Sequence, residues 1–125
     1  MGTDVSTNQA AGAIEARFRL PYGDFALDVD LCLPGRGIWL SDPTWPIHET
    51  LFAEAGLKVG HYPYVGADNR LDVEAMIAAL THLPKGDVVL LHACCHNPTG
   101  FDLTPRDFKR VLEVVKAREL LPLID

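Results

Sequence analysis

Short apolar runs alternate with helix-like stretches from about residue 37 to the end of the chain. Val88–Leu91 is apolar at every position, which is typical of a strand buried on both faces. Apolar residues recur at helical spacing between Leu71 and Leu83, and Thr104-Pro105 is a pair that typically begins a helix. The pattern predicts strands at 38–40, 57–64, 88–91 and 120–124, and helices at 46–55, 71–83 and 105–118.

Strands that alternate with helices of this length favour right-handed crossovers and a largely parallel sheet. The predicted fold class is therefore α/β. Residues 1–36 follow the pattern poorly: residues 10–18 could form a short helix, but prolines and glycines interrupt what comes next. We therefore divide the chain into a divergent or poorly ordered segment, 1–36, and a partial α/β domain, 37–125.

The charge and hydropathy of the chain argue against nucleic-acid and membrane partners. The 125 residues carry a net charge of −6, with eleven basic residues scattered along the chain, which argues against nucleic-acid binding. No apolar run approaches the length of a membrane span, so we expect no membrane partner. Three cysteines, two of them adjacent, make a poor disulfide framework, and a cytoplasmic protein is the expectation.

Two histidines and two cysteines follow the predicted strand at 88–91: His92, Cys94, Cys95 and His96. Imidazole and thiolate are good zinc ligands, but alternate residues of an extended strand face opposite sides. The sequence also has no second ligand pair at zinc-site spacing. We therefore expect buried strand cysteines and hydrogen-bonded histidines here, rather than a metal site or an activated thiol.

Chemically useful side chains stand near the ends of predicted strands. Asn97, in an Asn-Pro-Thr-Gly turn, can project its amide as donor and acceptor, although such a turn can equally be structural. Trp45 precedes a predicted helix, where its ring can join the core or offer a flat face to a planar ligand; His48 follows it by about one helical turn. Asp125 ends an apolar strand, where a buried carboxylate needs a partner and an exposed one does not.

Four segments carry a resemblance to a known family: SDPTWPIHETLFAEAGL, YPYVGADNRLDVEAMIAAL, GDVVLLHACCHNPTGFDLT and LLPLID. Their order and spacing resemble those of aspartate and aromatic-amino-acid aminotransferases, fold-type I enzymes that depend on pyridoxal 5'-phosphate (PLP). The resemblance covers about Pro34–Asp125 and implies an incomplete part of the family's three-layer, cofactor-binding large domain. It also implies an amino acid and a 2-oxo acid as substrates, and a homodimer for the full-length family.

The resemblance gives roles to the side chains singled out above. Trp45 would stack on the cofactor ring, Asn97 would hydrogen-bond its phenolic oxygen, and Asp125 would pair with its protonated pyridine nitrogen. His48 would support Asp125 from behind, and His92 would pack nearby in a supporting role.

The resemblance also implies which catalytic group is missing. The family's Schiff-base lysine, and its arginines for phosphate and substrate carboxylate, correspond to no residue here; Lys58, Lys85, Lys109 and Lys116 match none of them. We therefore expect an aminotransferase by family whose 125 residues alone have no catalytic residue and are inactive. The alternative is a non-catalytic remnant that binds PLP weakly or complements another fragment. Preference between aspartate and aromatic substrates stays open.

Overall fold

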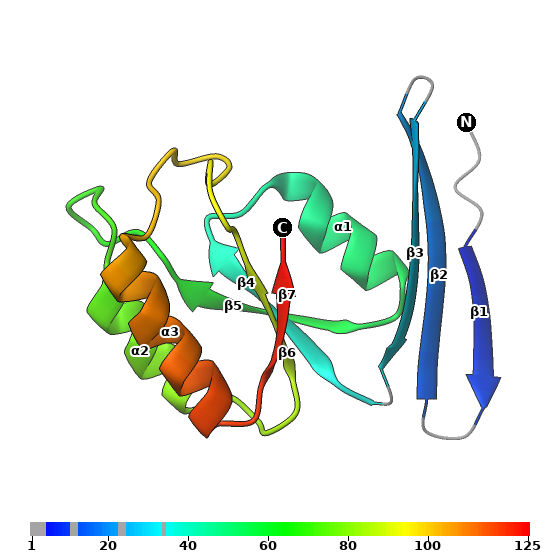
Figure 1. Ribbon diagram of the computed structural model, residues 1–125. Coiled ribbons are helices and arrows are strands. Elements are labelled where there is room, and N and C mark those ends of the chain that lie inside the picture. The colour runs from blue at the N-terminus through cyan, green and yellow to red at the C-terminus, as the bar shows by residue number, and fades with distance from the viewer. Residues whose placement is uncertain (1–4, 11–12, 23–24, 34) are drawn as a thin grey trace.

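The computed structural model describes residues 5–10, 13–22, 25–33 and 35–125, with side chains described from residue 35 onward. The N-terminal residues form an antiparallel sheet in the order β1-β2-β3, with bounds Val5–Ala10, Ala13–Tyr22 and Phe25–Leu33 (Figure 1). The strand β2 occupies most of the stretch expected to form a short helix at 10–18, so that prediction is wrong. The sequence of β2 alternates apolar and charged residues with a period of two, which favours a strand.

A second sheet has four strands in the order β5-β4-β6-β7, and every pairing in it is parallel. Its strands are β4 (Gly37–Asp42), β5 (Lys58–Pro63), β6 (Val88–Leu91) and β7 (Leu121–Ile124). The helices between them are α1 (Pro46–Glu54), α2 (Val73–Thr81) and α3 (Pro105–Ala117). The α/β class and each element expected beyond residue 36 are confirmed, with boundaries that differ by at most two residues.

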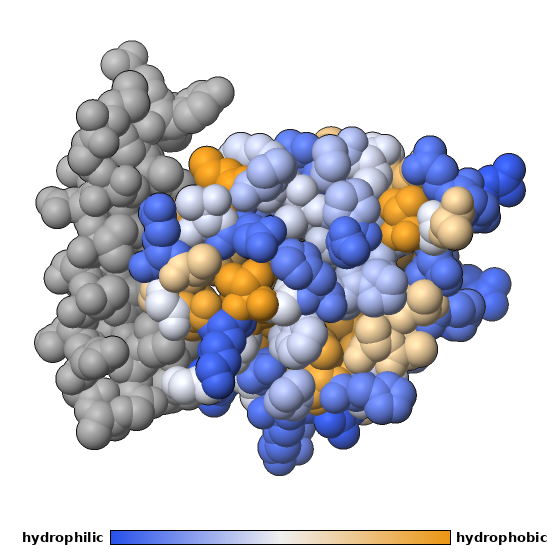
Figure 2. All heavy atoms as spheres, turned by 180° about the vertical axis from the view of Figure 1, so that it is seen from behind, coloured by the Kyte–Doolittle hydropathy of each residue, from blue (hydrophilic) through white to orange (hydrophobic). Residues whose placement is uncertain are grey.

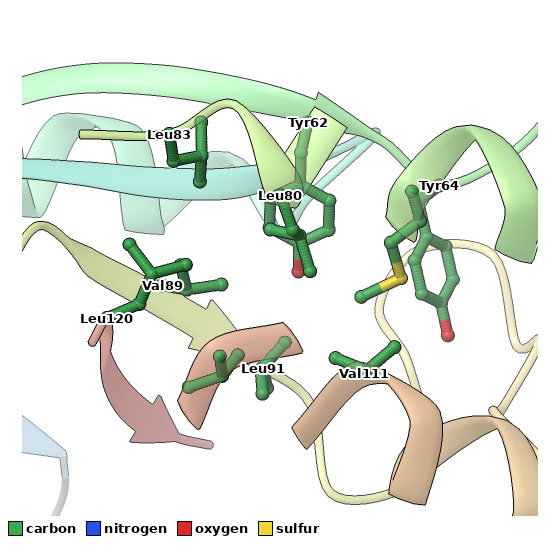
Figure 3. Close-up of a cluster of buried hydrophobic side chains, with 10 residues drawn as sticks. Tyr62, Tyr64, Leu80, Leu83, Val89, Leu91, Val111 and Leu120 are labelled. Atoms are coloured by element: carbon green, nitrogen blue, oxygen red, sulfur yellow. The ribbon is translucent and has the colours of Figure 1, made fainter. Parts of the chain in front are cut away.

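Apolar side chains from the two faces of this sheet form two separate cores. Val89 and Leu91 of β6 pack with residues of α2 and α3, whereas Val88 and Leu90 pack with residues of α1. Figure 3 shows the larger core, in which side chains from the sheet and from both helices point toward one another. The helices thus cover opposite faces, and this part of the chain has three layers.

The strand order reverses beside β4. From β4 the chain passes through α1 to β5 on one side, then crosses over to β6 on the other side. Right-handed crossovers in opposite directions place their helices on opposite faces, as the two cores require. The loop after β4 and the loop after β6 therefore lead to opposite faces of the sheet from the carboxyl ends of neighbouring strands. Open α/β sheets bind ligands at such a switch point.

Helices α2 and α3 begin at residues whose side chains accept a hydrogen bond from the first helical turn. The Asp72 carboxylate accepts from the Ala75 amide at 2.9 Å, and the Thr104 hydroxyl accepts from the Asp107 amide at 3.2 Å. Each acceptor satisfies an amide that has no partner within the helix. Helix α1 begins differently: Trp45 precedes Pro46 and makes no side-chain cap, which leaves its indole available for other contacts.

The coloured part of the surface in Figure 2 is mostly polar, with apolar side chains in small separate patches. Among the described residues, no helix has both the length and the apolar character needed to cross a membrane.

Leu80 tests the larger core, because its side chain is fully buried among α2, α3 and the sheet. We expect Leu80→Ala to lower the free energy of unfolding by about 2–5 kcal/mol, since it removes buried methyl groups and leaves a cavity. Leu112→Ala on α3 is the control, because Leu112 is 38% exposed; it should cost less than about 1 kcal/mol. Urea unfolding followed by circular dichroism measures both, and equal costs would contradict this packing.

Candidate functional site

The carboxyl edge of the parallel sheet brings together side chains from three strand ends. His48 comes from α1 after β4, His92 follows β6, and Asp125 follows β7. One ligand-capable atom from each of these three residues lies within 4.8 Å of the others. Residues far apart in the sequence thus meet beside the switch point.

A hydrogen-bonded chain holds the carboxylate of Asp125. His48 Nε2 donates to Asp125 Oδ2 at 2.9 Å, and His48 Nδ1 lies 3.0 Å from the Thr44 hydroxyl oxygen. The backbone of Asp125 is fixed as well: its amide donates to Leu91 at 2.9 Å, and its carbonyl accepts from Ala93 at 2.8 Å. The His48 side chain is 7% exposed and that of Asp125 is 54% exposed. A buried histidine therefore holds the carboxylate on one side, and the other side is open to solvent.

Two rings flank His48 edge to face. The Trp45 ring centroid lies 5.4 Å from that of His48 at an interplanar angle of 84°, and the His92 centroid lies 5.4 Å away at 88°. Trp45 is 44% exposed, an unusual state for a tryptophan outside a binding surface. The structure thus brings four of the five predicted site residues, Trp45, His48, His92 and Asp125, into one cluster.

His92 presents a buried nitrogen that lacks a partner. Its Nε2 is buried and makes no hydrogen bond within the described part of the chain. Its Nδ1 accepts a long hydrogen bond of 3.4 Å from the Asn97 amide, which places the proton of the neutral ring on Nε2. Burial lowers the pKa of His92, and the nearby His48 lowers it further. An unsatisfied buried N–H is costly, so it favours a ligand with an acceptor at this position.

The three-residue cluster of His48, His92 and Asp125 also has the composition of a metal site. Its hydrogen bonds favour another use. A metal ligand must present a lone pair, whereas Nε2 of His48 donates to Asp125 and Nε2 of His92 carries a proton. The cluster is therefore arranged as a carboxylate with hydrogen-bond donors.

Asn97 lies on the loop after β6, with its side chain exposed. A single carboxylate shapes this loop: Asp102 accepts from the Cys95 amide at 3.0 Å and from the His96 amide at 2.9 Å. These two hydrogen bonds lower the pKa of Asp102. The expectation of buried strand cysteines is wrong, since Cys94 and Cys95 are exposed thiols on this loop. Strand β6 ends at Leu91, and the chain bends away before it reaches them.

His96 is a feature that the sequence did not single out as a site residue. It is 2% exposed, and both ring nitrogens are bonded: Nε2 to the Ser41 hydroxyl at 2.9 Å and Nδ1 to the Thr99 hydroxyl at 2.7 Å. Its ring stacks on Tyr64 with centroids 3.9 Å apart and on His92 at 4.2 Å. Burial lowers its pKa to about 4, and nearby His92 and His48 act in the same direction, opposed by Asp102. His96 is therefore neutral near pH 7.

The family model for aminotransferases of class I and II matches residues 22–125, which is most of the chain. The chain belongs to this family. Its aminotransferase relatives include an aromatic-amino-acid aminotransferase from Pseudomonas aeruginosa, 78% identical over 103 residues, or 82% of this chain and 25% of that protein. An aspartate aminotransferase from the same organism is 44% identical over 123 residues, or 97% of this chain and 29% of that protein.

A solved aminotransferase structure has a similar fold over 72% of this chain. It is an aromatic-amino-acid aminotransferase from Burkholderia pseudomallei, covalently bound to pyridoxal phosphate. The two are 47% identical with a TM-score of 0.70, over 72% of this chain and 23% of that one. This aminotransferase chain thus spans about a quarter of the length of the relatives it matches.

The buried, neutral His96 predicts a pH dependence of stability. The pKa of His96 is about 4 in the folded chain against an ordinary value of 6.5, so between these pH values the unfolded chain binds a proton that the folded chain does not. The free energy of unfolding should therefore fall as the pH falls from 6.5 to 4, and His92, whose pKa is also lowered, adds to this fall.

Urea unfolding at several pH values measures this slope. His96→Gln should make it shallower, because glutamine does not titrate. The control Val115→Ala lowers stability in the core without changing a titratable group, and it should keep the slope. An unchanged slope in His96→Gln would contradict the assignment of a neutral His96.

Proposed function

We propose that these residues form the part of a PLP-dependent aminotransferase site that holds the cofactor ring. The observation that carries the proposal is the half-exposed carboxylate of Asp125, anchored by His48 at the switch point beside an exposed tryptophan. The PLP-bound relative from Burkholderia pseudomallei supports it.

The described side chains fit a planar, charged heterocycle. Trp45 offers an exposed aromatic face, and Asp125 offers an anionic oxygen to a protonated ring nitrogen. Asn97 offers an exposed amide for a phenolic oxygen, and His92 Nε2–H is a buried donor that has no acceptor among the described residues. Stacking face, anion and donors are the groups that such a ring requires.

When bound, PLP supplies an electron sink for the transfer of an amino group from an amino acid to a 2-oxo acid. The residues here prepare the site for it. Asp125 would keep a proton on the ring nitrogen, because a carboxylate beside that nitrogen favours its charged form. His48 donates to Oδ2 and so orients the carboxylate, while Thr44 fixes the His48 ring. Trp45, whose ring is exposed beside His48, would cover the cofactor ring and exclude water from it.

The four lysines of the chain lie away from this cluster. Lys58 begins β5, Lys85 precedes β6, and Lys109 and Lys116 are exposed on α3. Amino transfer needs a lysine amine that holds the cofactor and moves the substrate proton. We infer that this amine comes from polypeptide other than these 125 residues. The same observation favours a second candidate function, a non-catalytic chain that binds PLP weakly or complements another fragment of the fold.

We infer an aromatic amino acid as the substrate of the whole enzyme. The support is the 78% identity to the aromatic-amino-acid aminotransferase, against 44% to the aspartate aminotransferase of the same organism. A cytoplasmic location is proposed too, supported by two free, exposed cysteine thiols. The homodimer implied for the full-length family stays a prediction.

Cofactor binding is tested by titration with PLP, followed by quenching of tryptophan fluorescence. We expect the 125-residue chain to bind PLP, and expect Asn97→Ala and Asp125→Asn each to weaken binding by about tenfold, since each removes one hydrogen bond or charge pair. Asp68→Asn is the control for the charge change, because Asp68 is exposed on the loop after β5, and β5 and β7 lie at opposite edges of the sheet. Quenching that is equal in all four proteins would contradict the assigned site.

Catalytic incompleteness is tested with the same protein. Purified chain with PLP, 2-oxoglutarate and either aspartate or phenylalanine should form no oxaloacetate or phenylpyruvate, because no lysine reaches the site. Turnover that co-purifies with the chain and disappears in Asp125→Asn would contradict this. PLP binding without turnover supports a cofactor-binding segment, and the absence of both supports an inert remnant.

A further inference from the structure

His96 joins the two loops that carry Trp45 and Asn97, and none of the roles proposed above uses it. Ser41 is the penultimate residue of β4, four residues before Trp45. Thr99 lies two residues after Asn97. The imidazole of His96 bonds to both hydroxyls, so one buried ring spans the opening of the switch point.

The direction of each hydrogen bond follows from its neighbours. The Ser41 hydroxyl donates its proton to the Pro43 carbonyl at 2.9 Å, so toward His96 it acts as the acceptor of Nε2–H. Nδ1 of the neutral ring is then an acceptor, and the Thr99 hydroxyl donates to it at 2.7 Å. The Thr99 oxygen in turn accepts from the Phe101 amide at 3.1 Å. The donors and acceptors run in one direction, from Phe101 to Pro43.

The ring has little freedom to move within this chain of bonds. Tyr64 stacks on it at an interplanar angle of 10°, and the Tyr64 hydroxyl donates to the Phe101 carbonyl at 2.6 Å. His92 stacks on it at 27°. The His96 amide is held by Asp102 and its carbonyl by the Gly100 amide at 2.7 Å. These contacts fix both faces, both nitrogens and the backbone of His96.

We infer that His96 is a positioning residue: as a neutral ring protonated on Nε2, it sets the position of the Trp45 loop relative to the Asn97 loop. The inference rests on the proposed function in one respect: the proposed function makes Trp45 and Asn97 cofactor contacts, and His96 sets the spacing between them. Its physical basis is the bonding of Ser41 and Thr99 to the two nitrogens of one buried ring.

The tautomer is read directly by nitrogen NMR of the histidine-labelled 125-residue chain at pH 7. We expect the His96 signals, assigned by their loss in His96→Phe, to show the proton on Nε2 and Nδ1 as a hydrogen-bonded acceptor. A His96 ring protonated on Nδ1, or charged at pH 7, would overturn the inference.

The link between the loops is tested by changing one loop and observing the other. Ser41→Ala removes the acceptor on the β4 side and should shift the side-chain amide signals of Asn97. Thr99→Val removes the donor on the other side and should shift the indole N–H signal of Trp45. Thr81→Val is the matched control, because its hydroxyl bonds within α2 to Ile77, and it should move neither signal. Changes confined to the mutated loop would overturn the inference.

The consequence for the cofactor is measured separately. His96→Phe retains an aromatic ring for the stacks but loses both hydrogen bonds, and we expect it to raise the dissociation constant for PLP about tenfold. His96→Gln retains a donor toward Ser41 and should recover part of that loss. If the unaltered chain binds no PLP, the proposed function fails while the two NMR measurements still decide the role of His96. Unaltered PLP affinity in His96→Phe would overturn the positioning role.

Discussion

The burial of β6 on both faces and along both edges is the constraint on which the rest of this fold depends. Its four residues are at most 2% exposed, and they pair with β4 on one side and β7 on the other. Its alternate side chains lie in the two apolar cores, Val89 and Leu91 in one and Val88 and Leu90 in the other. A four-residue strand can hold these positions because all four residues pair with β7, two of them also pair with β4, and every side chain is packed.

The site residues are held in place because they lie next to that strand in the sequence or bond to its backbone. Leaving β6, the chain passes His92 and then bends to Asn97, while Asp125 bonds to the backbone of Leu91 and Ala93. The chemically active side chains thus stand within a few residues of the best-packed part of the sheet. Two neutral histidines add to this order: His92 and His96 stack on each other and, with Tyr64, fill the space beneath the loops.

The sequence was sufficient for elements whose signals are local. Apolar runs located β6 and β7, and Thr104-Pro105 located the start of α3, because burial and helix capping depend on a few adjacent residues. The period of two in β2 was equally local but was obscured by the prolines and glycines around it. The exposure of Cys94 and Cys95 could not be read from apolar alternation, since it depends on where β6 stops pairing.

The residues of the candidate site also fall into those that the sequence identified and those that only the structure shows. The resemblance supplied Trp45, His48 and Asp125, and the structure brings them together. The sequence indicated His96 only as a hydrogen-bonded histidine. Its partners could not be predicted, because Ser41 lies 55 residues earlier and the pair forms only when β4 and β6 are adjacent. Asp102 was missed for a related reason: its two amide partners are six and seven residues away, in a loop without a regular period.

The way Asp125 is held has a consequence for how this site can change over evolutionary time. Its place in space is set by main-chain bonds to Leu91 and Ala93, which any residue other than proline could make with its amide and carbonyl. The backbone at this position therefore does not require an aspartate. Replacing the carboxylate alters the charge presented at the sheet edge and removes the acceptor of the buried His48 Nε2–H, so a change of chemistry here costs stability through His48 and not through the main chain.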